Sequence, residues 1–355
     1  MKSLAQKIVV FLACAICSYA QGNAADAPFA SQASQVAAPT SDSTVAAQNL
    51  AASADSTSPA DTSFKFTHDN IFTIIGVVFT HHALRNSETL HDWPFFAIAA
   101  PAVSSTYKLE KNFGKKLGIK SDGAASLTPM NLGISASASV SLFHLLELGV
   151  KGTASSAWNY GKTSTFMGVY NPDKRNFDQD IFFTEGSFGV TYKANLTIPL
   201  LAFLPKSKWT KIILKGGANF ENSFYTGAKD GEPWKAGADI RINGFRSEFS
   251  GTLIYMLPFK HVNMAMLTAK VSGFIHEGDF DEIYKDYDPD FKTWSITPRV
   301  MFKINDKWSG IAMAPIARER KFDKSSYESN EELMLRKVGT EWRLKSVMCM
   351  LNRKF

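Results

Sequence analysis

The chain has 355 residues, a formal net charge of +6 and 45% hydrophobic residues. Beyond the first 20 residues no apolar run reaches the 18 or so residues that mark a transmembrane helix, which excludes a helical membrane protein. An excess of Lys and Arg is typical of nucleic-acid-binding proteins. These charges, however, are spread along the chain and the N-terminus carries an export signal, so we expect no nucleic-acid partner.

The first 20 residues have the pattern of a secretory signal peptide. Lysines precede an apolar stretch at residues 8–16, and small residues end at Ala20. Cleavage there removes two of the three cysteines and leaves Cys349. No disulfide can then form within the mature chain.

Residues 21–63 are rich in Ala, Ser, Thr, Asp and Pro and contain almost no aromatic residues. Such a composition cannot bury enough apolar surface to offset the entropy lost on ordering, so we expect a disordered linker. Residues 64–92 fit three interpretations, namely a periplasmic segment, a plug or extra strands.

From residue 93 to residue 355 the chain contains long segments in which apolar and polar residues alternate. The clearest is a hairpin at residues 188–224, where Val190 and Leu196 share one face and Lys193 lies on the other. A membrane-spanning strand needs only about 9 to 11 residues, so these arms are long enough to cross a bilayer. The alternation favours an outer-membrane β-barrel over a soluble β protein.

Nine alternating segments follow residue 130, and residues 93–109 supply one more. We therefore predict an all-β fold, an antiparallel transmembrane barrel of about ten strands within a range of 8 to 12. Long connections such as residues 161–183 and 277–292 alternate with short ones, which predicts long external loops and short periplasmic turns. The Asn-Gly pair at Asn243 is interpreted as a β-bulge in one long strand, because a hairpin there would place residues 161–183 in the periplasm.

Aromatic residues recur near the predicted strand ends, as in the interfacial girdles of membrane barrels. They are Trp158, Tyr160, Trp209, Phe224, Tyr225, Trp234, Phe259, Trp294 and Trp308.

The chain ends with Val347, Cys349, Leu351 and Phe355 at alternate or near-alternate positions. This ending resembles the terminal strand of Gram-negative outer-membrane β-barrel proteins as a class, although Arg353 occupies a position that is usually apolar there. The resemblance implies an outer-membrane location. It also implies two partners, the outer-membrane lipid and the barrel-assembly machinery that reads the final aromatic residue.

Charged residues recur at the alternate strand positions that are predicted to face the barrel lumen. They are Lys151, Lys193, Lys211, Lys215, Asp239, Arg241, Lys270, Arg299 and Lys303. They fit a salt-bridged interior filling, or a narrow passive pore for small solutes that prefers anions. Structural or surface display through the external loops is equally compatible with the sequence.

An outer-membrane enzyme of the protease or lipid-deacylase type, with a site at the outer rim, is the alternative from another class. His276, Glu277 and Asp279 lie at a predicted outer strand end, but no partner motif accompanies them, so we predict no catalytic residue. Adjacent histidines such as His81 and His82 point to opposite faces of a strand and cannot bind one metal ion together. The acidic residues 277–290 lack the spacing of an EF-hand calcium site. We predict neither a metal site nor a cofactor.

Overall fold

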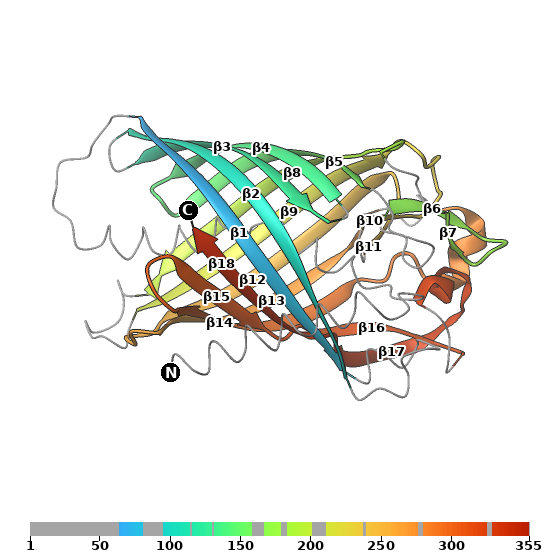
Figure 1. The fold of residues 1–355 in the computed structure, drawn as a ribbon. Helices are drawn as coiled ribbons and strands as arrows, with labels where there is room; N and C mark the ends of the chain where they lie inside the picture. Colours follow the sequence, from blue (N-terminus) through green and yellow to red (C-terminus); the bar gives the residue numbers. More distant parts are fainter. Residues whose placement is uncertain are drawn as a thin grey trace.

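The computed structural model describes residues 64–80, 95–113, 116–129, 131–157, 167–178, 183–200, 211–236, 239–275, 280–324 and 329–354. The signal peptide and linker predicted for residues 1–63 lie outside these ranges. The described strands form one closed antiparallel barrel and a small second sheet (Figure 1). None of the helices in the described ranges has the length and apolar content needed to cross a membrane.

The barrel wall follows the order of the chain, and it closes because β1 pairs with β18 and β13 pairs with β14. Its strands are β1 (Lys65–Thr80), β2 (Phe95–Phe113), β3 (Leu117–Thr128), β4 (Asn131–Leu142), β5 (Leu146–Ala157), β8 (Ser187–Pro199), β9 (Ile212–Tyr225), β12 (Gly244–Met256), β13 (Val262–Phe274), β14 (Thr293–Lys303), β15 (Trp308–Met313), β16 (Ile316–Phe322), β17 (Lys337–Leu344) and β18 (Val347–Lys354).

Two strands of the wall are interrupted. β15 and β16 both pair with β14, and Ala314 and Pro315 separate them. β16 pairs with β17 and β15 with β18, so β17 and β18 occupy one further position of the wall. Proline has no N–H to donate, which explains a break at Pro315; its carbonyl still accepts a hydrogen bond from the Lys345 N–H.

The wall therefore has twelve strand positions, so the predicted count of about ten is wrong, although twelve is the upper limit of the predicted range of 8 to 12. The two additional strands are β1, within the segment that the sequence left open, and β3. In β3 the alternation is weak because Gly123, Ala124 and Ala125 give little contrast between the two faces. Twelve is even, as single-chain bacterial barrels require.

Most connections are short at one end of the barrel and long at the other; the exceptions are residues 200–211 at the first end and residues 129–130 at the second. Residues 143–145, 257–261 and 304–307 are turns at the end where β18 finishes, which we call the turn end. At the opposite, loop end, the segment between β5 and β8 holds β6 (Met167–Asn171) and β7 (Asn176–Phe177). The loop end also contains β10 (Trp234–Ala236), β11 (Asp239–Arg241), η3 (Glu282–Tyr287) and η4 (Ser329–Met334), as Figure 1 shows.

The loop-end elements form a small folded unit that we call the cap. The second sheet has the order β11-β10-β6-β7. Nine buried side chains pack together between this sheet, the two 3-10 helices and the adjoining strand ends. They are Tyr170, Phe177, Ile242, Phe280, Tyr284, Tyr287, Phe322, Leu333 and Leu335.

The Asn243-Gly244 step joins the two sheets. β11 pairs with β10 in the cap, whereas β12 starts at Gly244 in the barrel, so neither a hairpin nor a bulge in one long strand describes this step. Gly244 has φ of 151°, a backbone conformation that other residues rarely adopt. The Asn243 side chain accepts a hydrogen bond from the Tyr225 N–H and donates to the Ala228 carbonyl, which fixes the corner.

The predicted aromatic girdle is only partly present. Phe224, Phe259 and Trp294 are about half exposed on the outside of the barrel. Tyr225 and Trp234 are instead buried and stacked on each other where the end of β9 meets β10 of the cap, with ring centroids 5.2 Å apart. Trp158, Tyr160 and Trp209 lie outside the described residues, and Trp308 is partly buried beside Arg353.

Candidate functional site

The two faces of the barrel wall differ in exposure and chemistry. On β8, Val190, Tyr192 and Leu196 are 41 to 54% exposed, while the intervening residues are less exposed. On β4 every second residue from Leu132 to Leu142 is exposed and apolar, and serines occupy most of the positions between them. The outer face is thus an apolar band, and the polar or buried residues point into the lumen.

On β2 from Ser104 onward, on β3, β4, β5 and β8, and on the middle of β9, the lumen face consists of small, mostly polar residues and charges, and we call it the polar wall. Asp122 accepts a hydrogen bond of 2.7 Å from the Ser137 hydroxyl. Five lysines and three carboxylates share this wall with Glu221. The lysines are Lys108, Lys120, Lys151, Lys193 and Lys215, and the carboxylates are Glu110, Asp122 and Glu147.

The opposite side of the lumen is apolar near the turn end. We call this surface the methionine belt. It consists of Met256, Met264, Met266, Met301, Met313, Met348 and Met350, with Ile75, Ile213, Ile254 and Ile311.

The belt is continuous because its residues face one another directly across the strands. Met256 lies opposite Met264, and Met264 lies opposite Met301. Ile311 then lies opposite both Met301 and Met350. Met264 is 0% exposed and Met266 6%, so the belt is closely packed around these two residues, whereas Arg299, Met301 and Met313 remain partly exposed.

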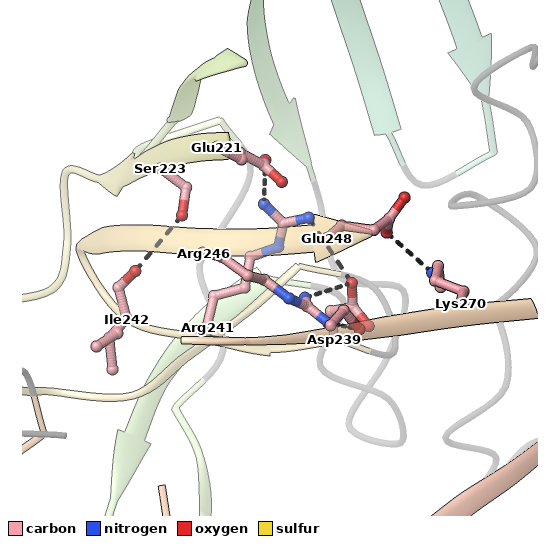
Figure 2. Close-up of polar contacts among 9 residues, drawn as sticks. Glu221, Ser223, Asp239, Arg241, Ile242, Arg246, Glu248 and Lys270 are labelled. Carbon is pink, nitrogen blue, oxygen red and sulfur yellow. Dashed lines mark hydrogen bonds and ion pairs between the residues drawn. The ribbon is translucent and has the colours of Figure 1, made fainter. Parts of the chain in front are cut away.

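A network of ion pairs lies near the loop end of the lumen (Figure 2). Arg241 of β11 places Nη1 2.6 Å from Oε1 of Glu221 on β9. Asp239 Oδ2 lies 3.3 Å from Nη1 of Arg246 on β12 and 3.7 Å from Nη2 of Arg241. Burial alone would lower the pKa of Arg241, but the carboxylates of Glu221 and Asp239 outweigh it and raise that pKa.

A second pair extends the network along β12. Lys270 Nζ donates to Oε2 of Glu248 at 3.0 Å, and the Asn219 amide donates to Oε1 of the same carboxylate at 3.3 Å. Arg246 also donates to the Ser272 hydroxyl at 3.4 Å. The network therefore ties the β10–β11 hairpin to three neighbouring strands of the wall.

Among the ionisable groups of the cap with shifted pKa values, Lys235 and Glu332 move toward neutral pH. Lys235 is 6% exposed, and its desolvation lowers its pKa to about 8 even though the charge of Glu332 opposes the shift. Glu332 in η4 is desolvated and lies near Glu319, which together raise its pKa to about 7. The Lys235 ammonium also lies 5.4 Å from the centre of the Phe177 ring. The cap thus holds titratable groups whose charge changes near neutral pH.

The sequence-predicted lumen residues fall into three groups. Lys151, Lys193, Lys215, Lys270 and Arg299 lie on barrel strands at lumen positions. Asp239 and Arg241 belong to β11 of the cap sheet and not to the wall, although their side chains meet wall residues.

The third group lies at the turn end. Lys211 is exposed just before β9. Lys303 ends β14 and pairs at 2.7 Å with Asp306 in the following turn.

The alternation of the sequence was not followed far enough to predict several lumen residues that the structure brings together. Arg246 and Glu248 share the lumen parity of Ile254, and continuing the alternation along β12 would have found them. The belt methionines alternate in the same way with outward-facing residues such as Leu267 and Val300. The C-terminal residues Val347 and Cys349 are exposed on the outer face, while Phe355 lies outside the described residues.

The candidate enzyme residues His276, Glu277 and Asp279 also lie outside the described residues. In the part of the chain that the structure describes, no group of three His, Cys, Asp or Glu side chains could hold a metal ion. Asp288 from the acidic segment instead forms an ion pair with Lys337. The cations Arg318 and Arg320 pack against the ring of Phe291 beside it.

No protein-family model matches the chain, and no curated protein sequence matches it significantly. Solved structures that resemble it include the translocator domain of the autotransporter NalP from Neisseria meningitidis, at 9% identity over 88% of this chain and 98% of that chain, with a TM-score of 0.34. An outer membrane channel from Pseudomonas putida F1 matches at 8% identity over 85% of this chain and 99% of that chain, with a TM-score of 0.38. The NanC porin matches at 8% identity over 80% of this chain and 100% of that chain, with a TM-score of 0.34. At TM-scores below 0.5 this likeness carries no functional argument.

Proposed function

We propose that the chain is an outer-membrane channel that passes small solutes through a narrow lumen and prefers anions. The observation that carries the proposal is the closed wall of twelve strand positions whose outside is an apolar band and whose inside has a polar wall. A closed barrel leaves no unpaired sheet edge, which is the condition for crossing lipid with strands. The short connections of the turn end then face the periplasm, and the cap faces outward.

The width supports a narrow passage. Barrels of eight strands are filled by side chains, whereas porins of 16 to 18 strands leave an aqueous channel, so twelve strand positions lie between the two. The methionine belt occupies one side of the lumen near the turn end, and its apolar side chains offer water few hydrogen-bonding groups. Water and solutes would therefore pass along the polar wall opposite it.

The charge balance supports the anion preference. Five lysines face three carboxylates on the polar wall, while Glu221 is held by Arg241. In a narrow passage with low-dielectric sides, this excess of positive charge lowers the energy of an anion and raises that of a cation. The cations of the ion-pair network add little, because carboxylates accompany them.

Reconstitution into planar bilayers tests the proposal. Under a salt gradient the reversal potential should have the sign of an anion-selective channel, and Lys151→Glu combined with Lys193→Glu should weaken or reverse it. Lys229→Glu, on an exposed residue of the cap, is the matched control and should leave the potential unchanged. No current from correctly folded protein would remove the channel proposal.

Surface display or binding through the external loops is a second candidate function. The cap favours it, because nine buried side chains give these loops a folded core that a simple connection would not need. A protein that assembles fully, carries no current and keeps a protease-resistant cap would select display over transport.

A further inference from the structure

Arg299 introduces a positive charge into the methionine belt. It lies on β14 between Met266 on β13 and Met313 on β15, its direct cross-strand neighbours. Met301 is two residues further along the same face. The Arg299 Nε is buried and has no hydrogen-bond partner among the described residues.

The carboxylate whose charge acts on Arg299 is already engaged. It belongs to Glu248, which accepts hydrogen bonds from Lys270 at 3.0 Å and from Asn219 at 3.3 Å. A buried donor without a partner carries a desolvation cost that a hydrogen-bonding ligand would remove. An anion at this place would gain a charge-assisted hydrogen bond in a low-dielectric setting, where such a bond is stronger than in water.

The surroundings of Arg299 also determine what the rest of a ligand must be. Thioether side chains are flexible and polarizable, and they adapt to apolar ligands of different shape. Met266, Met301 and Met313 therefore provide a surface for an aliphatic tail next to the guanidinium. A doubly charged or strongly hydrated anion would lose its hydration without finding polar partners on this surface.

We propose that Arg299 and the methionine belt form a binding site for a small amphipathic monoanion, a carboxylate with an aliphatic tail. The carboxylate accepts from the Arg299 guanidinium, and the tail lies on Met266, Met301 and Met313. This proposal rests on the proposed channel function and names its substrate class. The polar wall attracts the anion, and the belt selects the molecule that carries a tail.

Octanoate is the test ligand, and three compounds serve as controls. Acetate lacks the aliphatic tail, octanol lacks the charge, and octylammonium carries the opposite charge. The full-length mature protein in lipid nanodiscs, with 13C-labelled methionine methyl groups, reports the site directly. Octanoate should shift the Met266, Met301 and Met313 resonances saturably and leave Met334 of the cap unchanged. Acetate and octylammonium should not shift them, and octanol should act only at far higher concentration.

Arg299→Gln should raise the apparent Kd for octanoate at least about tenfold, because it removes a charge-assisted hydrogen bond. Arg299→Lys should give an intermediate Kd, and Arg336→Gln, an exposed arginine of the cap, should give the wild-type value. The proposal is overturned if octanol or octylammonium matches octanoate on the wild-type protein, a result that does not depend on any variant folding. Octanoate binding without bilayer current would support this site and contradict the channel function. Bilayer current without octanoate binding would support the channel function and contradict this site.

Discussion

The outer face of β13 offers a strict test of the membrane placement. Leu267 is near the middle of this strand and 47% exposed, beside Leu253 at 43% on β12. Phe259, in the turn between β12 and β13, is exposed to nearly the same degree at 53%. The two positions differ chiefly in depth along the barrel.

Depth sets the expected cost of a charge. Arginine at the bilayer midplane on the lipid face of a barrel costs about 2 to 4 kcal/mol, which falls to about 0 to 1 kcal/mol near the interface. Leu267→Arg should therefore lower the folding equilibrium constant roughly 25- to 700-fold, since about 1.4 kcal/mol corresponds to a factor of ten. Phe259→Arg should change it less than about fivefold.

Urea titration of refolding into lipid vesicles, followed by the gel shift between folded and unfolded protein, measures both values. In water a substitution of an exposed residue usually changes stability by less than about 0.5 kcal/mol. Equal and small effects at Leu267 and Phe259 would mean that the outer face of the barrel is not in lipid.

Three further predictions follow from the loops and the cap. Trypsin added to intact cells should cut after Lys174, Arg175 or Lys285, which are exposed at the loop end. It should spare Lys260 and Lys307 at the turn end, and cleavage at these two alone would mean that the barrel has the opposite orientation in the membrane. Because the folded-state pKa of Lys235 is about 8 and its ordinary value is 10.5, its burial cost is fully present below pH 8 and is lost as the pH rises to 10.5. Hydrogen exchange of the β10 amides, corrected for the intrinsic rate, should show that the free energy of opening rises by up to about 3 kcal/mol across that window, and Lys235→Met should abolish this rise. A rise that persists in Lys235→Met would show that Lys235 is not the titrating group. Arg241→Gln leaves Glu221 and Asp239 without their shared cation and should destabilise the β10–β11 hairpin by about 1.5 to 3 kcal/mol in the same exchange experiment, whereas Lys285→Gln should have no effect there.

The barrel could be predicted from the sequence where the chemical contrast between the two faces is strong. The serines of β4 and the Leu196 face of β8 alternate so clearly that both strands and their facing follow from period two alone. β3 was missed because its centre is Gly and Ala, which suit either face. The interruption at Pro315 blurs the last two strand positions in the same way.

The cap and the belt were harder to predict for different reasons. Parity assumes that consecutive residues share one sheet, and it fails at Ile242 and Asn243, where the chain passes from the cap sheet to the barrel. The belt methionines occupy the lumen positions of their strands. An apolar residue at such a position weakens the apolar–polar alternation, and its role becomes clear only when its cross-strand neighbours are known. Met256, Met264 and Met301 become one surface only through the register of three strands.

Water access to the polar wall tests the central claim most directly. In a Cys349→Ala background, Ser137→Cys places a thiol on the lumen face of β4 and Ala138→Cys places one on the adjacent outer face. During bilayer recording, an anionic thiol-specific reagent should modify the Ser137→Cys protein and reduce its current, and it should leave the Ala138→Cys protein unchanged. Modification of the outer position alone, or of neither position in a protein that conducts, would contradict a water-filled passage along the polar wall.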